Sequence, residues 1–251
     1  MELVNKILEL FWTMSYQEAF FWLLIQNILQ FAFCMVGGHL LIMFFQSKRI
    51  YQAPQDLSKF EVGLSILCVV MNTLVALAGW QLWKMGIITI NREISLYCLI
   101  DVIALLAMMD FFMYLTHRIV HIKGIYELVH KTHHQYELTR PLSLFVLSPL
   151  EVIGFGLLWL VILTLYPSSW LGIVIYLLIN AAFGALGHIG VEPYPKFYLN
   201  IPILNRFTTS TFHAQHHKEI DSNFGFYTDI WDRAYGTINK GYKTLFKKVA
   251  V

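Results

Sequence analysis

Histidine is the residue type whose spacing in this sequence most clearly suggests chemistry. Ten histidines occur, and nine of them lie between residues 117 and 217. His117 and His121 form an HxxxH pattern. On an α-helix this spacing places two imidazoles about 40° apart in azimuth and one turn apart in height. Both side chains can then reach one metal ion, although a single HxxxH pattern also arises by chance.

An HxxHH pattern occurs twice, at residues 130–134 and at residues 213–217. In each copy the positions i, i+3 and i+4 share one helical face. Crowding three imidazoles near a membrane is costly unless they share a partner, so the repetition favours metal binding. His188 lies at the end of the last long apolar run, residues 170–188, and is expected to emerge from the membrane on the same side as the three histidine patterns. The candidate metal ligands are therefore His117, His121, His130, His133, His134, His188, His213, His216 and His217, and the eight in the three patterns are also the candidate catalytic residues.

Nine imidazoles are more than one zinc ion uses, since structural zinc takes four ligands and catalytic zinc three protein ligands. The sequence therefore predicts two metal ions. All-imidazole coordination suits iron, zinc or copper, so the residue types alone leave the metal open. The tenth histidine, His39, lies alone in an apolar run beside Gly37 and Gly38, and we interpret it as a helix-packing residue.

Metal-bound imidazoles need their second ring nitrogen oriented by a carboxylate or a carbonyl. Asp110 is a candidate, because a carboxylate within an apolar run is costly without a partner. Asp229 and Asp232 are further candidates, and a salt bridge to Arg233 or a helix cap explains Asp232 equally well. Tyr114 could line the site, but an aromatic residue at this position is more typical of an interfacial anchor.

The elements that hold these histidines are predicted to lie in a membrane. The chain is 57% hydrophobic and 14% charged, which departs from the average soluble domain. Apolar runs long enough to cross a hydrocarbon core, which takes about 20 helical residues, cover residues 19–45, 60–83 and 94–115. Two further runs, 150–166 and 170–188, are separated by a proline-containing turn and predict a hairpin. We therefore expect an all-α polytopic membrane protein with four to five transmembrane or re-entrant helices.

Charge and short-range patterns add to this prediction. Lys and Arg gather in the loops at the histidine end, so the positive-inside rule places the histidines at the cytoplasmic face, with Lys84 and Arg92 as exceptions on the other side. The first residues have the periodicity of an interfacial helix and lack the features of a cleaved signal peptide. A net charge of +2 gives no indication of a nucleic-acid partner. Three cysteines within apolar runs, Cys34, Cys68 and Cys98, are expected to be inert.

The order HxxxH, HxxHH, HxxHH resembles the fatty acid hydroxylase superfamily, which includes sterol C5-desaturases, C4-methylsterol oxidases and sphingoid-base C4-hydroxylases. The short interval from His121 to His130 fits this family, and residues 223–237 are similar to its NFG…WDRLFGT tail. The resemblance covers roughly residues 95–240. It implies transmembrane helices under a cytosolic helical cap, with residues 1–93 as N-terminal membrane helices and residues 94–251 as the catalytic domain of one integrated unit.

The resemblance further implies a non-haem diiron centre that uses O2, with the histidines of the three patterns as iron ligands and His188 matching a histidine often found before the last pattern. The expected reaction is hydroxylation or desaturation of a C–H bond in a sterol, sphingoid base, fatty acyl chain or carotenoid. Because the chain has no haem, flavin or dinucleotide motif, electrons are expected from a cytochrome b5-like or ferredoxin-like donor. The expected membrane is the endoplasmic reticulum in a eukaryote and the inner membrane in a bacterium. A basic tail could dock an acidic donor or lie beside anionic lipid, and consists of Lys240, Lys243, Lys247 and Lys248.

Two other classes of protein compete with an oxygenase. A zinc-dependent membrane hydrolase acting on a lipid ester or amide would use a metal-bound water, but the histidine patterns lack the Glu of an HExxH motif. A metal carrier would place histidines along the spans near the bilayer midplane, where only His39 lies. The oxygenase is therefore the favoured hypothesis.

Overall fold

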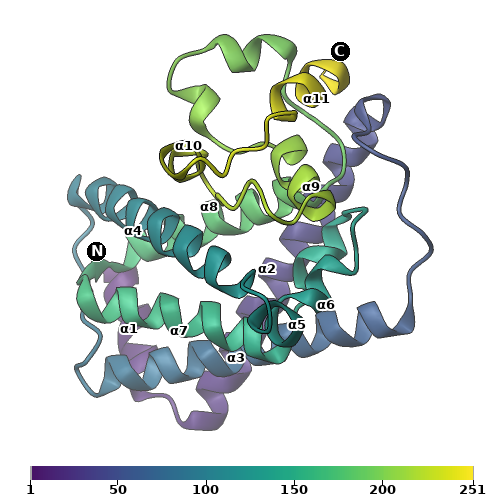
Figure 1. Ribbon diagram of the computed structural model, residues 1–251. Coiled ribbons are helices and arrows are strands. Elements are labelled where there is room, and N and C mark those ends of the chain that lie inside the picture. The colour runs from purple at the N-terminus through teal and green to yellow at the C-terminus, as the bar shows by residue number, and fades with distance from the viewer. Residues whose placement is uncertain (1, 251) are drawn as a thin grey trace.

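A computed structural model describes residues 2–250, and its architecture is dominated by five long apolar helices (Figure 1). Four of them, α2, α3, α4 and α8, are long and apolar enough to cross a membrane, whereas α7 is shorter at 17 residues. The expected all-α polytopic membrane protein with four to five membrane helices is therefore confirmed. The helices are α2 (Tyr16–Phe45), α3 (Lys59–Lys84), α4 (Tyr97–Val120), α7 (Pro149–Leu165) and α8 (Trp170–His188).

Serine residues begin four of these helices. Ser15 and Ser58 form capping boxes at the start of α2 and α3. Ser148 and Ser169 accept a backbone N–H of the first turn of α7 and α8. A side-chain cap satisfies one of the donors that the first turn leaves free and stabilises the helix by about 1 kcal/mol. These caps explain why the helices begin within a few residues of the predicted apolar runs.

One end of the bundle is closed by short contacts between its loops. The two-residue strands β1 (Ile90–Asn91) and β2 (Ser168–Ser169) pair in parallel, which joins the loop after α3 to the turn between α7 and α8. The N-terminal helix α1 (Glu2–Thr13) packs at the same end, where Trp80 Nε1 donates a hydrogen bond to the carbonyl of Phe11 at 2.8 Å. This end lies away from the histidines, as the predicted orientation requires.

A cap of short helices covers the other end. In Figure 1 its later segments, coloured green to yellow after α8, form a lobe above the long helices. Segment 46–48, at the end of α2, forms a short 3-10 helix, η1 (Gln46–Lys48). The cap consists of α5 (Ile125–Val129), α6 (Lys131–His134), η2 (Pro141–Phe145), η3 (Lys196–Asn200), η4 (Leu204–Arg206), α9 (Ser210–Lys218), α10 (Ile230–Tyr235) and α11 (Tyr242–Val249).

The cap is hydrogen-bonded deep into the bundle. Asp110 in α4 accepts hydrogen bonds from the backbone N–H groups of Tyr227 and Thr228, at 3.2 and 2.9 Å, and from Trp231 Nε1 at 3.1 Å. The hydroxyl of Tyr227 donates to Asn180 of α8 at 2.6 Å. The segment before α10 is therefore wedged between α4 and α8, which fixes the cap relative to the membrane helices.

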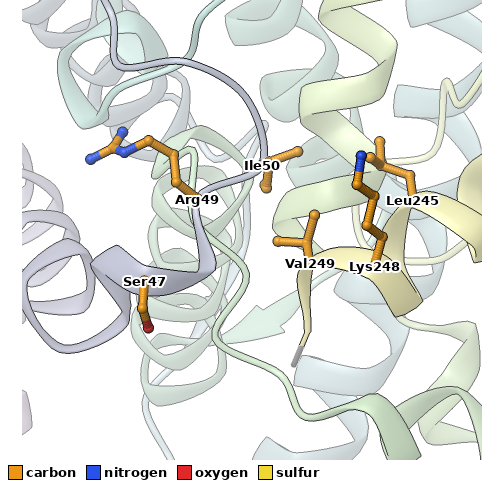
Figure 2. Close-up of a pocket in the computed structure, with 6 residues that line it drawn as sticks. All are labelled: Ser47, Arg49, Ile50, Leu245, Lys248 and Val249. Carbon is orange, nitrogen blue, oxygen red and sulfur yellow. The ribbon is translucent and has the colours of Figure 1, made fainter.

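A cavity lies at each end of the bundle. At the end with α1, Glu9, Trp12, Thr13 and Arg92 line a cavity of about 230 Å3. At the histidine end, a cavity of about 500 Å3 lies between the segment after α2 and the helix α11 (Figure 2). Its lining residues are Ser47, Arg49, Ile50, Leu245, Lys248 and Val249.

Candidate metal centre

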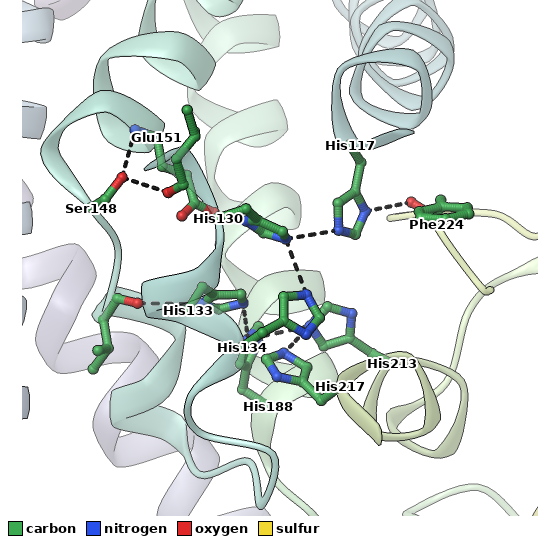
Figure 3. A network of polar contacts seen from close by, with 12 residues as sticks. His117, His130, His133, His134, Ser148, Glu151, His188, His213, His217 and Phe224 are labelled. Carbon is green, nitrogen blue, oxygen red and sulfur yellow. Dashed lines mark hydrogen bonds and ion pairs between the residues drawn. The ribbon is translucent and has the colours of Figure 1, made fainter. Parts of the chain in front are cut away.

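The nine predicted histidines come together at the junction of the bundle and the cap, in two groups. Within each group the candidate ligand atoms all lie within 4.8 Å of one another. Figure 3 shows side chains of both groups pointing toward a common centre. The five-histidine group contains His117, His121, His130, His134 and His216, and the four-histidine group contains His133, His188, His213 and His217.

The two HxxHH patterns divide between the groups in opposite ways. His130 and His134 belong to the five-histidine group, whereas His133, which lies between them in the sequence, belongs to the four-histidine group. His213 and His217 join the four-histidine group, and His216 crosses to the first. Residues i and i+4 are about 40° apart around a helix, whereas i+3 is displaced by about 60° to the other side. Each pattern therefore contributes to both groups, and two metal ions could share this arrangement.

Local structure brings the first two patterns together. The helix α4 extends beyond the predicted end of its apolar run at residue 115 to Val120, so His117 lies within it and His121 is its C-terminal cap residue. Gly124 follows with φ of +92°, a conformation that glycine adopts readily, and the chain turns there into α5. This tight return explains how the short interval before His130 suffices to face the two patterns.

Five of the histidines are oriented through Nδ1. His117 donates to the carbonyl of Phe224 at 2.8 Å, and His130 donates to the carboxylate of Glu151 at 2.6 Å (Figure 3). The other three donate to backbone carbonyls, since a carbonyl can only accept. These are His133 to Val146 at 3.3 Å, His188 to Gly184 at 2.9 Å and His216 to Ser222 at 2.7 Å.

The Nδ1 protons leave Nε2 as a lone pair in these five neutral imidazoles. The Nε2 atoms of His117 and His130 nevertheless lie 3.2 Å apart, and those of His133 and His188 lie 3.3 Å apart. Two acceptors at this distance repel each other unless a cation lies between them. The surroundings of His121 also indicate a bound cation, because both of its ring nitrogens are buried without a hydrogen-bond partner among residues 2–250.

The spacing of these nitrogens fits a metal ion. With metal–nitrogen bonds of about 2.1 Å, two ligands at 90° to 109° have nitrogens about 3.0 to 3.4 Å apart. His130 Nε2 lies 3.2 Å from His134 Nε2, and His213 Nε2 lies 3.2 Å from both His188 Nε2 and His217 Nε2. The residues present therefore fit a metal ion in each group.

Burial keeps the imidazoles of the cap neutral. It lowers the pKa of His121 to about 3, with a further contribution from His117. The same causes, burial first and neighbouring imidazoles second, lower the pKa of the other cap histidines below the ordinary value. Neutral imidazole is the form that binds a metal ion. These other histidines are His130, His133, His134, His213, His216 and His217.

The acidic candidates have positions that differ from their expected roles. Asp110 holds the segment before α10 through three backbone or indole N–H groups instead of contacting a histidine. Asp229 forms the ion pair with Arg233 at 2.6 Å, a partner expected for Asp232. Asp232 accepts from the N–H groups of Phe224 and Gly225 at 2.9 and 2.7 Å. It therefore fixes the Phe224–Gly225 peptide, whose carbonyl orients His117, and acts on the site through that peptide without contacting a histidine.

Glu151 is the functional acid that sequence reasoning missed. Its carboxylate, 1% exposed, accepts the Nδ1 proton of His130, which is 3% exposed. Ser148 caps α7 and places Glu151 in its first turn (Figure 3). An acid three residues after a Ser-Pro helix start is an ordinary N-terminal signal, so only the contact across 21 residues reveals the role. A carboxylate at the border of an apolar helix was the available clue.

Glu192 is a second acid that positions the site. It is fully buried and accepts from the N–H of Thr211 at 3.0 Å, in the first turn of the helix α9 that carries the third pattern. A carboxylate at a helix N-terminus also complements the helix dipole. Burial raises the pKa of Glu192. This contact ties α9 to the chain just after His188.

The remaining candidates lie outside the two groups. His39 is exposed on α2, and its Nδ1 donates to the carbonyl of Met35 at 2.7 Å, so it is satisfied by its own helix. The hydroxyl of Tyr114 lies 3.0 Å from that of Thr237, and its ring stacks on Tyr235. Tyr114 is therefore a packing residue beneath the cap, and it anchors the tail after α10.

Comparison with known proteins identifies the family. The family model named Fatty acid hydroxylase matches residues 102–237, which is more than half of the chain. The chain therefore belongs to the fatty acid hydroxylase family, and the resemblance predicted from the histidine patterns is confirmed. No solved structure shows a significant match.

Several curated proteins are similar to the chain. It is 28% identical over 143 residues to the Delta(7)-sterol 5(6)-desaturase of Leptosphaeria maculans, which covers 57% of this chain and 38% of that protein. It is 30% identical over 146 residues to the very-long-chain aldehyde decarbonylase GL1-6 of Oryza sativa subsp. indica, covering 55% and 23%. It is 27% identical over 214 residues to the Delta(7)-sterol 5(6)-desaturase erg3B of Aspergillus fumigatus, covering 80% and 60%. The chain thus spans less than two thirds of the length of each of these three relatives. Proteins named as sterol desaturases are thus among its relatives, and four of its own helices are long and apolar enough to cross a membrane.

Proposed function

We propose that this protein is a non-haem diiron oxygenase that hydroxylates or desaturates a C–H bond of a membrane lipid with O2 and external electrons. The observation that supports it best is the pair of imidazole groups in which Nε2 lone pairs, such as those of His117 and His130, face each other at 3.2 Å. The relatives named as sterol desaturases and as an aldehyde decarbonylase support a hydrophobic substrate. A sterol, sphingoid base or fatty acyl chain is the proposed substrate class.

Each part of the site has a role in this proposal. The nine histidines would hold two iron ions, which when bound supply the reduction of O2 and the removal of hydrogen from carbon. The Nδ1 contacts of His130 and His117, to Glu151 and to the carbonyl of Phe224, hold the rings in place and increase their basicity as ligands. The cap excludes water, since His216 is fully buried and His217 is 1% exposed. A buried site protects a strong oxidant from side reactions.

The partners and the orientation belong to the same proposal. The lipid would arrive laterally from the bilayer, past the apolar helices α7 and α8. A cytochrome b5-like or ferredoxin-like protein would deliver electrons at the cytoplasmic face, where the basic side chains of α11 offer a surface for an acidic partner. We propose the endoplasmic reticulum as the membrane in a eukaryotic source and the inner membrane in a bacterial one.

Metal analysis tests the proposal. The full chain is purified in detergent from iron-supplemented cells, and metal content and Mössbauer spectra are recorded before and after O2 meets the reduced protein. We expect about two irons per chain that react with O2. His133→Ala should lose metal, whereas the matched control His39→Ala should keep it. Two zinc ions per chain with no O2 consumption would overturn the proposal and indicate a membrane hydrolase.

A lipid profile then identifies the reaction. Cells that express the protein are compared with cells that express His133→Ala and His39→Ala. An alcohol or alkene that is present with the unchanged protein and with His39→Ala, but absent with His133→Ala, gives the product. Identical lipid profiles in all strains, with a donor of electrons supplied, would count against a lipid oxidase.

A further inference from the structure

The cavity between the end of α2 and the helix α11 lies outside the metal centre and combines cations with apolar side chains. Arg49 and Lys248 contribute the cations, and Ile50, Leu245 and Val249 contribute an apolar wall (Figure 2). Its volume of about 500 Å3 lies within the range of small-ligand sites, about 300 to 1,000 Å3. The size and the lining are those of a ligand site.

The two cations have no acidic partner. The salt bridges formed within residues 2–250 involve neither Arg49 nor Lys248, and the six lining residues include no acid. The cavity at the opposite end differs, because its Arg92 lies 4.0 Å from Glu9. A pair of cations without a carboxylate favours an anionic ligand.

The position of the cavity specifies the kind of anion. Met43 and Phe44, in the last turn of α2, are 69% and 78% exposed, as expected for side chains that face lipid. Ser47 and Arg49 follow a few residues later, and both line the cavity. The cavity therefore lies where α2 leaves the hydrocarbon, at the level of lipid headgroups. An anion attached to an apolar chain would satisfy both the cations and the apolar wall.

We infer that this cavity binds the phosphate headgroup of an anionic membrane lipid. Lys248 would contact the phosphate, and Arg49, whose side chain points away from Lys248 in Figure 2, would turn toward it from the opposite side. The apolar wall would contact the glycerol and the first acyl carbons. Such a lipid would hold the basic helix α11 on the membrane surface, where Lys and Arg side chains are attracted to an anionic leaflet. The inference is independent of the proposed reaction and of the metal.

Backbone contacts link this cavity to the metal centre. The N–H of Ile50 donates to the carbonyl of Gly190 at 3.1 Å, and the N–H of Glu192 donates to the carbonyl of Lys48 at 2.9 Å. Glu192 in turn accepts from Thr211 at the start of α9. A bound lipid would stabilise this connected segment, so the thermal unfolding temperature should rise when the lipid is added.

Native mass spectrometry tests the inference. The delipidated full chain in neutral detergent is titrated with phosphatidylglycerol or with phosphatidylcholine of the same acyl chains. We expect the protein to prefer phosphatidylglycerol, and the variant Arg49→Gln/Lys248→Gln to bind it about tenfold more weakly. The matched control Lys243→Gln/Lys247→Gln removes two charges that do not line the cavity, and should reduce binding by no more than about threefold. Unchanged metal content shows that each variant is folded.

A second variant separates the cavity from its charge. Leu245→Trp keeps both cations but fills the cavity, and we expect the same loss of binding and of thermal stabilisation. Equal losses in both charge variants would overturn the inference in favour of diffuse attraction. Displacement of the lipid by millimolar inorganic phosphate would indicate a site for free anions. Binding of cytochrome b5 that requires Arg49 and Lys248, with phosphatidylglycerol binding unaffected, would assign the surface to a protein partner.

Discussion

At the scale of single residues, the decisive feature is where the imidazole protons lie. A carbonyl or carboxylate at Nδ1 fixes the tautomer, as at His117 and His130, and leaves Nε2 free to bind a metal ion. Of these orienting partners, Glu151 alone is an ionisable side chain, and the others are backbone carbonyls. It should therefore influence the basicity of its histidine more than the backbone carbonyls influence theirs.

Replacing Glu151 tests this role. Glu151→Gln keeps an acceptor for His130 but removes the ionisable carboxyl group, and Glu151→Leu removes both. We expect metal affinity to fall about 10- to 100-fold, more for Leu than for Gln, because partners that orient metal ligands have effects of that size. Competition with a chelator measures the affinity, and Glu127→Gln on the exposed side of α5 is the control. Equal metal retention in all variants would show that the contact is only structural.

The depressed pKa values predict how stability depends on pH. In the unfolded chain histidine binds a proton below about pH 6.5. In the folded, metal-free protein His121 stays neutral until about pH 3, and the six other cap histidines also have lowered pKa values. Lowering the pH below 6.5 therefore stabilises the unfolded state, by about 1 kcal/mol per histidine over the first pH unit.

We expect the unfolding temperature of the metal-free protein to fall steeply between pH 7 and pH 5. Buried acids such as Glu192 and Asp232 act in the opposite direction, because their raised pKa values make the folded state bind a proton first, but the seven histidines outnumber them. Scanning fluorimetry measures the effect, and His121→Gln should reduce the slope. A flat profile over this range would contradict the buried, neutral state of these imidazoles.

Much of the site at this scale was predictable from the sequence. The types and spacing of the nine histidines predicted the cluster, because ligand patterns at i, i+3 and i+4 are local. The partition of the groups was not predictable, since His133 and His216 change group according to where facing helices place them. Glu151 was not predicted for the same reason, because only the fold brings it close to His130.

At the scale of elements, the contact between α8 and α9 sets the spacing of the four-histidine group. A Cβ added to Gly187 would lie 3.2 Å from the ring of His213, closer than ordinary van der Waals contact. The two helices therefore approach each other closely because residue 187 lacks a side chain. His188 is the next residue of α8, so a shift of either helix would change the distance between two candidate ligands.

Gly187→Ala should consequently weaken metal binding in the four-histidine group without unfolding the protein. We expect about half of the bound metal to be lost during chelator challenge, because only one of two groups is affected. The control Gly154→Ala lies in α7, where an added Cβ meets nothing within 4 Å. Metal content after chelator challenge is compared between Gly187→Ala and the control. If Gly187→Ala retained all of its metal, the ring of His213 would be able to shift without weakening metal binding.

The long helices show what hydropathy can and cannot predict. The runs 19–45 and 60–83 became α2 (Tyr16–Phe45) and α3 (Lys59–Lys84), because apolar length determines a membrane helix. The run ending at 115 missed the last turn of α4, since His117 and Arg118 continue the helix beyond the apolar region. The position of the segment before α10, between α4 and α8, could not be predicted. It depends on hydrogen bonds between Asp110 and residues more than 100 positions later in the chain. The proposed boundary between residues 93 and 94 stays a prediction.

At the scale of the whole molecule, the remaining question is which side of the membrane holds the metal centre. Three basic residues lie at the far end and oppose the positive-inside rule, but each has a local partner, which for Lys6 is Glu2 at 2.6 Å. Arg92 lies 4.0 Å from Glu9, and Lys84 lies over the ring of Trp80, 4.6 Å from its centre. The histidine end carries more Lys and Arg in its loops, so it is expected to face the cytoplasm.

Cysteine labelling in intact cells decides this orientation. The native cysteines, Cys34, Cys68 and Cys98, are buried and should react little. Lys123→Cys is exposed at the histidine end, and Met85→Cys, at a residue 61% exposed, marks the other end. A thiol reagent that cannot cross membranes should label position 85 in intact cells and position 123 only after permeabilisation, with each protein compared before and after detergent. The reverse pattern would place the metal centre outside the cytoplasm, away from a cytosolic electron donor, and would require a different source of electrons for the proposed reaction.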